Sequence, residues 1–183
     1  GAVVSIDGKK SRKVVDKALS IVEKLEHRAG KDASGKTGDG VGILLQICHN
    51  FFTKAAAEAG ISISGEGEYG IGQFFFPMNK SEAENEMKRF EAACSEANLK
   101  FLGWRTVPVL SDVLDNHTLE CIPSIYQGFV EKPSDCEKGL EFDKLLYKLR
   151  RSFEKSDTTP AKTYICSLSS RTIVYKGMFL VQQ

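Results

Sequence analysis

Apolar residues recur at helical spacing in several stretches of the chain. Ser11 is a residue type that often caps helix N-termini, and the apolar positions from Val14 to Leu25 behind it share one face. This pattern predicts a helix that ends near Arg28. The same spacing predicts longer helices over residues 81–97 and 142–153, and a shorter helix over residues 50–60, with Gly60 as its stop.

Short β-type runs lie between these helices, and most are bounded by glycine, proline or turn residues. They are residues 2–6, 41–47, 71–76, 99–109, 121–132, 163–168 and 171–181. The run 41–47 is continuously apolar but for one residue, so it is expected to be a buried strand. The tight turn at Ser169 and Ser170 predicts a β-hairpin between the last two strands and favours antiparallel pairing. The order of elements is typical of an α+β protein. With no internal repeat or linker, residues 1–183 are expected to be a single domain.

Residues 30–37, "GKDASGKT", match the phosphate-loop pattern G-x-x-x-x-G-K-[ST], which raises the hypothesis of nucleotide binding through Gly35, Lys36 and Thr37. A phosphate loop needs a strand before it and a helix after it, so that the helix N-terminus faces the anion. Here a helix leads into the loop. The following residues, "GDGVG", are too rich in glycine to begin a helix. The pattern therefore favours a glycine-rich connection between a helix and a strand.

Composition narrows the classes of partner. The 183 residues carry 25 basic and 24 acidic side chains, a net charge of +1, which gives no reason to expect a nucleic acid or an anionic membrane surface. No apolar run approaches the length that spans a bilayer. The five cysteines have no C-x-x-C pair and no histidine at zinc spacing. They are therefore expected to be reduced thiols of a cytoplasmic protein, with no metal site.

Three separated segments carry a resemblance to a known family. Residues 25–52 read "LEHRAGKDASGKTGDGVGILLQICHNFF", residues 102–109 read "LGWRTVPV", and residues 164–180 read "YICSLSSRTIVYKGMFL". In this order and spacing they resemble the N-terminal part of the class II glutamine amidotransferase (glutaminase) domain of the glutamate synthase large subunit. The likeness covers essentially the whole chain.

The resemblance implies an N-terminal-nucleophile hydrolase fold of the αββα sandwich type, with two antiparallel sheets between helical layers, here truncated. It implies hydrolysis of glutamine to glutamate and ammonia. The ammonia would pass to a synthase domain or subunit that acts on 2-oxoglutarate in ammonia assimilation. The resemblance places no cofactor in this domain, and it places FMN and an iron–sulfur cluster elsewhere in the parent enzyme.

The nucleophile of the family is a cysteine at the start of the mature chain. This sequence opens with "GAVVSIDG", so the nucleophile is expected to lie upstream of Gly1, and none of the five internal cysteines matches it. No catalytic residue is therefore assigned within residues 1–183, and the chain alone is predicted to be inactive. The resemblance does carry over the wall of the glutaminase pocket. There the candidates are Arg28, Asp39 and Gly40, although Arg28 could equally be a helix-end cation and Asp39 a turn residue.

A second hypothesis is a non-catalytic binding or assembly domain that kept the amidotransferase fold. A cysteine in the nucleophile position of the native chain would favour the enzyme, and another residue there would favour the binding domain. Nucleotide binding is the third hypothesis and the weakest, and titration with ATP and Mg²⁺ would test it.

Overall fold

The computed structural model describes residues 1–31, 35, 38, 40–110, 112, 119–156 and 163–177. Their main elements are, in chain order, α1 (Arg12–Glu23), η1 (Glu26–Arg28), β1 (Val41–Gln46), α2 (His49–Glu58), β2 (Tyr69–Phe76), α3 (Lys80–Glu96), β3 (Phe101–Thr106), β4 (Ser124–Glu131), α5 (Leu140–Lys155), β5 (Tyr164–Ser169) and β6 (Thr172–Gly177). They belong to two compact units. The smaller unit comprises residues 1–46, 110–121 and 174–183, and the larger unit comprises residues 47–109 and 122–173.

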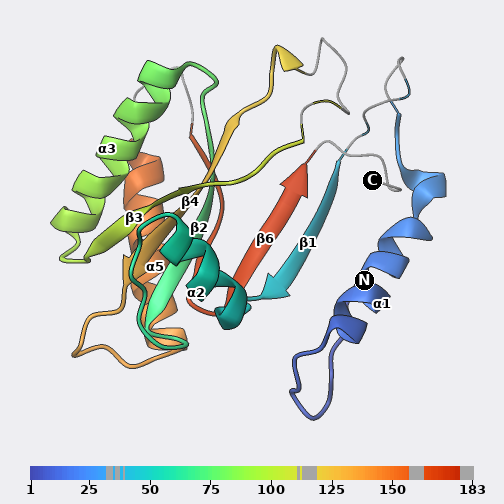
Figure 1. Cartoon of the computed structure of the whole chain (residues 1–183), viewed down its shortest axis with the longest axis horizontal. Helices are drawn as coiled ribbons and strands as arrows, with labels where there is room; N and C mark the ends of the chain where they lie inside the picture. The colour runs from blue at the N-terminus through green and yellow to red at the C-terminus, as the bar shows by residue number, and fades with distance from the viewer. Residues whose placement is uncertain are drawn as a thin grey trace. The chain divides into compact units, whose positions relative to one another are not determined.

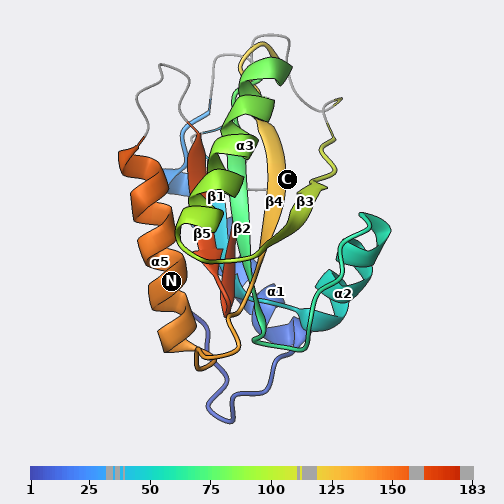
Figure 2. The ribbon, with the colours of Figure 1, turned by 90° about the vertical axis from the view of Figure 1, so that its left-hand side faces the viewer.

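The larger unit is built on a four-stranded sheet in the order β3-β4-β2-β5. Every pair of neighbours in this sheet is antiparallel. Helices α3 and α5 lie across one face of the sheet (Figure 2). The α+β class and the antiparallel pairing predicted from the sequence are therefore confirmed in this unit.

The core of the larger unit lies between the sheet and these two helices. The ring of Phe74 on β2 contacts Phe90 on α3 edge to face, with centroids 4.7 Å apart, and Phe90 contacts Phe153 on α5 at 5.4 Å. All three are fully buried. Burial of an aromatic side chain contributes on the order of 2 kcal/mol, and a well-packed aromatic pair adds about 1 kcal/mol. This cluster therefore ties both helices to the central strand.

Two glycines make room for the aromatic side chains of this core. Gly72 on β2 lies opposite Gly128 on β4 in the sheet register. A Cβ atom at Gly72 would stand 2.2 Å from the Phe74 ring, and one at Gly128 would stand 2.7 Å from the indole of Trp104. Because real Cβ atoms do not approach other heavy atoms so closely, larger residues at either position would displace the rings. The two glycines thus create the slot that Phe74 and Trp104 fill.

The other face of the sheet is partly covered by α2. The ring of Phe52 on α2 contacts Phe129 on β4 at 6.2 Å, and Tyr69 on β2 contacts the same ring at 6.4 Å. Further along this face the central strands carry two buried amides, Gln73 and Gln127, directly opposite each other. This face therefore combines an aromatic contact with a buried polar patch.

In the smaller unit β1 pairs with β6, and α1 contacts β1. The two strands run in opposite directions (Figure 1). Side chains along β1 alternate between half-buried and exposed positions. The prediction of a buried strand here is wrong: Leu44 is 63 % exposed, because one face of β1 has no covering layer among the described residues.

Two local predictions near the N-terminus are also wrong. Residues 2–6 form no strand, although the turn predicted after them is present, with Gly8 N–H donating to the Ser5 carbonyl at 3.0 Å. A β-type run needs a partner strand to form a ladder, and this run has none in the described part of the chain. Helix α1 begins after Ser11 as predicted but ends at Glu23, and a 3-10 turn at Glu26–Arg28 follows.

The predicted hairpin between the last two strands is wrong. Strand β5 pairs with β2 in the four-stranded sheet, whereas β6 pairs with β1. The chain turns at Ser170 and Arg171, and the Arg171 carbonyl accepts a hydrogen bond from the Ile47 N–H at 2.9 Å. The tight turn predicted from the sequence is present, but it is a corner between two sheets.

Candidate functional site

Arg28, the first predicted residue of the pocket wall, ends the 3-10 turn in the smaller unit. Its N–H donates to the Leu25 carbonyl at 2.9 Å, which fixes the backbone at this point. The residue is exposed, and no described residue forms an ion pair or side-chain hydrogen bond with its guanidinium. The Arg28 side chain therefore does not cap the 3-10 turn, and its guanidinium is exposed to solvent.

The glycine-rich connection after Arg28 is closed by an isolated antiparallel bridge between Lys31 and Gly38. The Lys31 ammonium also lies 3.3 Å from a carboxylate oxygen of Glu26 on the 3-10 turn. The bridge draws together the two ends of the loop that carry the predicted pocket residues. Asp39, the second of these residues, lies outside the described part of the chain, so its role stays a prediction.

Gly40, the third predicted residue, enters β1 with a φ of +109°, a conformation that side-chain-bearing residues rarely adopt. A Cβ atom here would stand 3.1 Å from the carbonyl oxygen of Gly177, at the end of β6. Gly40 is therefore needed for the close passage of β1 and β6. This requirement comes from the fold of the smaller unit and does not depend on a ligand.

The structure bears on the phosphate-loop pattern as well. The loop is entered from the 3-10 turn and left through β1, so a strand stands where a phosphate loop has its helix. The order of elements inferred from the sequence is confirmed. Gly35 has a φ of +68°, as expected of a turn glycine, while Lys36 and Thr37 lie outside the described residues.

A second candidate region is the corner between β5 and β6, where the "SSR" of the third family-like segment is located. Several groups of this corner are hydrogen-bonded to the carboxylate of Asp143, which lies in the first turn of α5. It accepts hydrogen bonds from the Ser170 N–H at 2.7 Å and the Ser170 hydroxyl at 2.8 Å, and from the Arg171 Nε at 2.7 Å. The Ser169 hydroxyl is also within 3.2 Å.

The electrostatics of this corner favour an ionised carboxylate. Burial alone would raise the pKa of Asp143, but the hydrogen bonds from Ser170 and Arg171 outweigh it, and the pKa lies below its ordinary value. Arg171 thus has a structural partner in Asp143. The polar groups named here are hydrogen-bonded to one another, so the role of this corner is structural rather than catalytic.

A third region is the polar patch on the sheet face that α2 partly covers. The Gln127 amide Nε2 donates to the Gln73 Oε1 at 3.0 Å, and the Gln127 Oε1 accepts from the Arg105 Nη1 at 2.9 Å. Gln73 and Gln127 are 3 % and 1 % exposed. Arg105, on the edge strand β3, also has its guanidinium carbon 5.8 Å from the centroid of the Phe51 ring. A chain of buried amides therefore holds a half-buried cation.

The start of α2 carries an aromatic and imidazole pair. His49 begins the helix, and its Nδ1 lies 3.0 Å from the hydroxyl of Tyr69. Burial raises the pKa of Tyr69 to about 12, so the phenol stays protonated at neutral pH and can donate to the imidazole. The contact links α2 to β2 and leaves the neighbouring Cys48 exposed.

None of the five cysteines, all of which lie in described parts of the chain, forms a disulfide. Cys94 is fully buried in the core against α5, and burial raises the pKa of its thiol to about 12, which leaves almost no thiolate at neutral pH. Cys136 donates weakly to the Glu137 carbonyl at 3.4 Å. Cys94 is therefore unsuited to the role of the activated thiol that an acyl-transfer enzyme requires.

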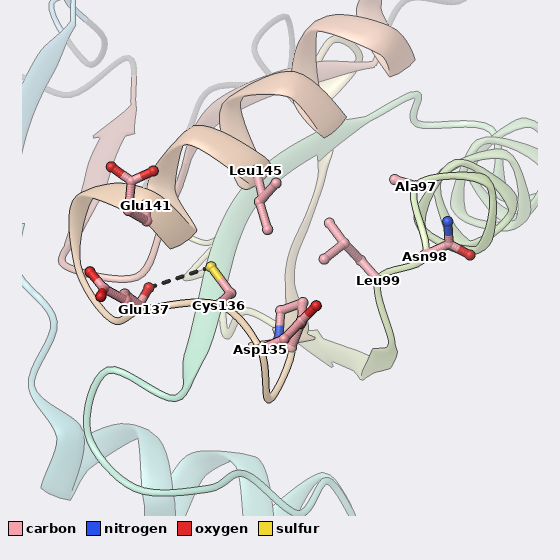
Figure 3. A pocket seen from close by; sticks show the side chains of 9 residues that line it. Ala97, Asn98, Leu99, Asp135, Cys136, Glu137, Glu141 and Leu145 are labelled. Carbon is pink, nitrogen blue, oxygen red and sulfur yellow. Dashed lines mark hydrogen bonds between the residues drawn. The ribbon is translucent and has the colours of Figure 1, made fainter.

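A surface hollow of about 470 Å³ opens where α3 ends and α5 begins (Figure 3). Its floor is apolar and its rim is acidic; the lining residues are Ala97, Asn98, Leu99, Pro133, Asp135, Cys136, Glu137, Glu141 and Leu145. No imidazole or hydroxyl side chain lines it. Among the described residues, no group of three or more His, Cys, Asp or Glu side chains is arranged to hold a metal ion.

Comparison with known proteins places the fold in a family. Residues 1–183 match the family model of the class-II glutamine amidotransferases, so the chain belongs to that family. The N-terminal-nucleophile hydrolase fold implied by the resemblance is therefore confirmed. The helices of the described residues include none that is long and apolar enough to cross a membrane.

The relatives are parts of much longer proteins. The chain is 33 % identical over 184 residues to "Glutamate synthase [NADPH] large chain" of Bacillus subtilis (strain 168), and 34 % identical over 189 residues to the protein of that name in Azospirillum brasilense. Each alignment covers 100 % of this chain and 12 % of the relative. It is also 33 % identical over 181 residues to "Ferredoxin-dependent glutamate synthase, chloroplastic" of Oryza sativa subsp. japonica, covering 97 % and 11 %. The chain thus spans about an eighth of the length of these relatives.

The structure also identifies residues that the sequence analysis did not single out. They are Asp143, which organises the corner, and the amides Gln73 and Gln127, which hold Arg105. The polar residue within an otherwise apolar strand, "IGQFFF", was the available signal for Gln73. The partners of Asp143 and Gln73 are 27 and 54 residues away in sequence, which no local pattern reveals.

Proposed function

We propose that the chain is part of the glutaminase domain of a glutamate synthase. In this function the parent protein hydrolyses the side-chain amide of glutamine to glutamate and ammonia, and the ammonia is transferred to 2-oxoglutarate. The observation that carries the proposal is the match of the whole chain to the class-II amidotransferases, together with its similarity to glutamate synthase large chains.

The proposed chemistry requires a thiolate nucleophile and a base beside it. The resemblance supplies both through an N-terminal cysteine, because its own α-amine can accept the thiol proton. We place this cysteine before Gly1 in the parent chain. The burial of Cys94, which raises the pKa of its thiol to about 12, argues against this cysteine as the nucleophile and is compatible with an external one. Residues 1–183 alone are therefore proposed to be inactive.

Within the chain, the loop between the 3-10 turn and β1 is proposed to form one wall of the glutaminase pocket. Arg28 offers an exposed cation that no described residue neutralises, and Gly40 lies beyond the bridge at the opposite end of the loop. Asp39 precedes Gly40 in the sequence and is part of the proposed wall on the resemblance. An exposed guanidinium can bind a carboxylate or stabilise a neighbouring segment of the parent chain. Gly40 contributes by keeping β1 close to β6.

The remaining parts of the proposal concern the parent protein. Its synthase region, either fused or in a separate subunit, would carry FMN and an iron–sulfur cluster and would be the partner of this domain. The compartment proposed is the cytoplasm, which is compatible with five cysteines that form no disulfide among the described residues. The chain matches relatives named for NADPH and for ferredoxin about equally well, so the similarity is independent of the reductant.

The experiment that tests the proposal is a glutaminase assay on the full-length native polypeptide and on residues 1–183 alone, with glutamate and ammonia measured together. Full-length protein is expected to release both products in equal amounts, and the 183-residue chain to release neither. The Cys48→Ser and Cys121→Ser variants serve as matched controls, because these exposed cysteines are not the proposed nucleophile. Activity of the 183-residue chain, or loss of activity in either control variant, would overturn the assignment of the nucleophile.

A further inference from the structure

Two arginines of the larger unit, Arg89 and Arg105, form their hydrogen bonds through different nitrogens of the guanidinium group. Arg89 on α3 binds the Glu86 carboxylate with one edge: its Nε lies 3.0 Å from Oε1 and its Nη2 lies 2.8 Å from Oε2. Its Nη1 donates to the Phe153 carbonyl at 2.8 Å. This edge, Nε with Nη2, is the one that matches the two oxygens of a carboxylate.

Arg105 is held through the opposite side of its guanidinium. Its Nη1 donates to the Gln127 Oε1 at 2.9 Å, so the contact that fixes its position is a neutral amide. Among the described residues, no carboxylate forms an ion pair with Arg105, and no acceptor is hydrogen-bonded to its Nε or Nη2. The edge that Arg89 uses for a carboxylate is thus unoccupied in Arg105.

The buried amides fix the direction of this edge. Gln127 is 1 % exposed and donates its Nε2 to the Gln73 Oε1, which leaves its own Oε1 for Arg105. Burial of the pair removes water as a competing partner, so the amide orientation is set by this one contact. A half-buried cation without a counter-charge is costly, and a bound anion relieves the cost.

We propose that Arg105 is a carboxylate-binding residue, positioned by Gln127 and Gln73, whose Nε and Nη2 edge accepts an incoming carboxylate. The Phe51 ring, 48 % exposed, is an apolar neighbour of the guanidinium. The planar fork of an arginine matches the two oxygens of a carboxylate. No covalent step is involved.

Such a carboxylate has two possible sources with the same chemistry. One is a free carboxylic acid, of which an amino acid is an example. The other is an aspartate or glutamate side chain in the part of the parent polypeptide outside residues 1–183, which in the relatives is most of the protein. The second source rests on the proposed function, whereas the first rests only on the geometry of the larger unit.

The test uses the full-length native polypeptide and three variants. Arg105→Met removes the fork, and Gln127→Glu places an internal carboxylate against the Nη1 side of Arg105 and so neutralises the cation. Arg151→Met is the matched control, because Arg151 is an exposed arginine that pairs with Glu154 on its own helix. The first readout is the shift in melting temperature produced by sodium acetate relative to sodium chloride at the same ionic strength. The second is hydrogen exchange of segments outside residues 1–183, without added acetate.

If the source is a free carboxylate, acetate raises the melting temperature of the wild type and of Arg151→Met, and this shift is lost in Arg105→Met and Gln127→Glu. If the source is a side chain of the parent, acetate has no such effect. In that case Arg105→Met and Gln127→Glu speed hydrogen exchange in a segment outside residues 1–183, and Arg151→Met does not. Absence of both effects would overturn the proposal. Neither readout depends on glutamine turnover, so this failure would leave the glutaminase function standing.

Discussion

Arg89 and Arg105 are both half-buried arginines of the larger unit, yet their surroundings differ in charge. Arg89 stacks over the Phe153 ring at 3.6 Å, is paired with Glu86, and donates to the Phe153 carbonyl near the end of α5. Glu86 in turn accepts from the Thr163 hydroxyl at 2.6 Å, immediately before β5. The charge is neutralised within the fold, and it joins α3, α5 and the start of β5.

Arg105 stands in a different kind of network. Its partners in the described structure are an amide and, at 5.8 Å, an aromatic ring. The comparison teaches that two arginines with similar burial can have different roles. The closed ion pair contributes to stability, because removing either partner leaves a buried charge. The open one contributes little to stability and keeps a binding edge for an anion.

The largest expected effect on the free energy of unfolding comes from removing the carboxylate that pairs with Arg89. Glu86→Ala is expected to destabilise the larger unit by about 3 kcal/mol, because it removes a buried carboxylate that binds both the Arg89 guanidinium and the Thr163 hydroxyl. Urea unfolding followed by the fluorescence of Trp104, which packs against Phe90 in this core, measures the change. The matched control is Glu84→Ala on the same helix, whose exposed pair with Lys80 is expected to contribute less than about 0.5 kcal/mol. Equal effects of the two substitutions would contradict the distinction between closed and exposed pairs.

A smaller effect is expected at the corner between the sheets, where Asp143 pairs with Arg171. Asp143→Asn is expected to cost about 2 kcal/mol at neutral pH, the loss of hydrogen bonds to a charged acceptor. The substitution also changes the pH dependence. The folded-state pKa of Asp143 lies below that of the unfolded chain. Its contribution is therefore complete above the unfolded-state pKa and is lost as the pH falls through the folded-state pKa.

Urea midpoints of wild type and Asp143→Asn, measured between neutral and strongly acid pH, check this prediction. The difference in stability between the two proteins should shrink as the pH falls. A difference that stays constant down to the acid end would show that the charge of Asp143 plays no part. Ser152→Ala, an exposed change on the same helix, is the control and should leave the pH profile unchanged.

The smallest expected effect is at Arg105. Without a ligand, Arg105→Met is expected to change the free energy of unfolding by less than about 1 kcal/mol, because only a hydrogen bond to a neutral amide is lost. Gln127→Glu supplies a counter-charge but removes the Nε2 donor to the Gln73 Oε1, so its stability is expected to stay within about 1 kcal/mol of the wild type. The same urea measurement compares both with Glu86→Ala. A loss at Arg105→Met as large as that at Glu86→Ala would mean that Arg105 is a structural residue.

Much of the fold could be predicted because its helices have strong periodic signals. The helix predicted over residues 142–153 lies within α5, where Leu149 and Phe153 are buried. The helix predicted over residues 81–97 is found at Lys80–Glu96, where Phe90 and Cys94 are buried. The spacing of apolar residues and the capping residues of a helix are local features, so they can be recognised in a single sequence.

The pairing of strands was less predictable because it depends on distant partners. Ser169 and Ser170 indicate a turn correctly, but no local feature says that β5 and β6 belong to different sheets. The turn is held by a hydrogen bond to Asp143, which lies on a helix that precedes β5 in the chain. The β-type composition of residues 2–6 likewise indicates a preference for strand structure, but it does not show which strand would pair with them.

The candidate pocket wall rests on the resemblance more than on chemistry. Arg28 and Gly40 lie on either side of a bridged loop, and their place in a pocket wall stays a prediction. The Arg105 network could not be found from the sequence. A single glutamine in a strand is usually a surface residue, and only the register of β2, β4 and β3 makes these three side chains neighbours.

The central claim is that this chain belongs to a glutamine-hydrolysing domain that supplies nitrogen to a synthase. The most direct measurement supplies the full-length native polypeptide with glutamine labelled with ¹⁵N in its side-chain amide, together with 2-oxoglutarate and a reductant. The account predicts that the label appears in the amino group of newly formed glutamate. Release of no labelled nitrogen, either as ammonia or as glutamate, would contradict it and favour a domain that kept the amidotransferase fold without its catalysis.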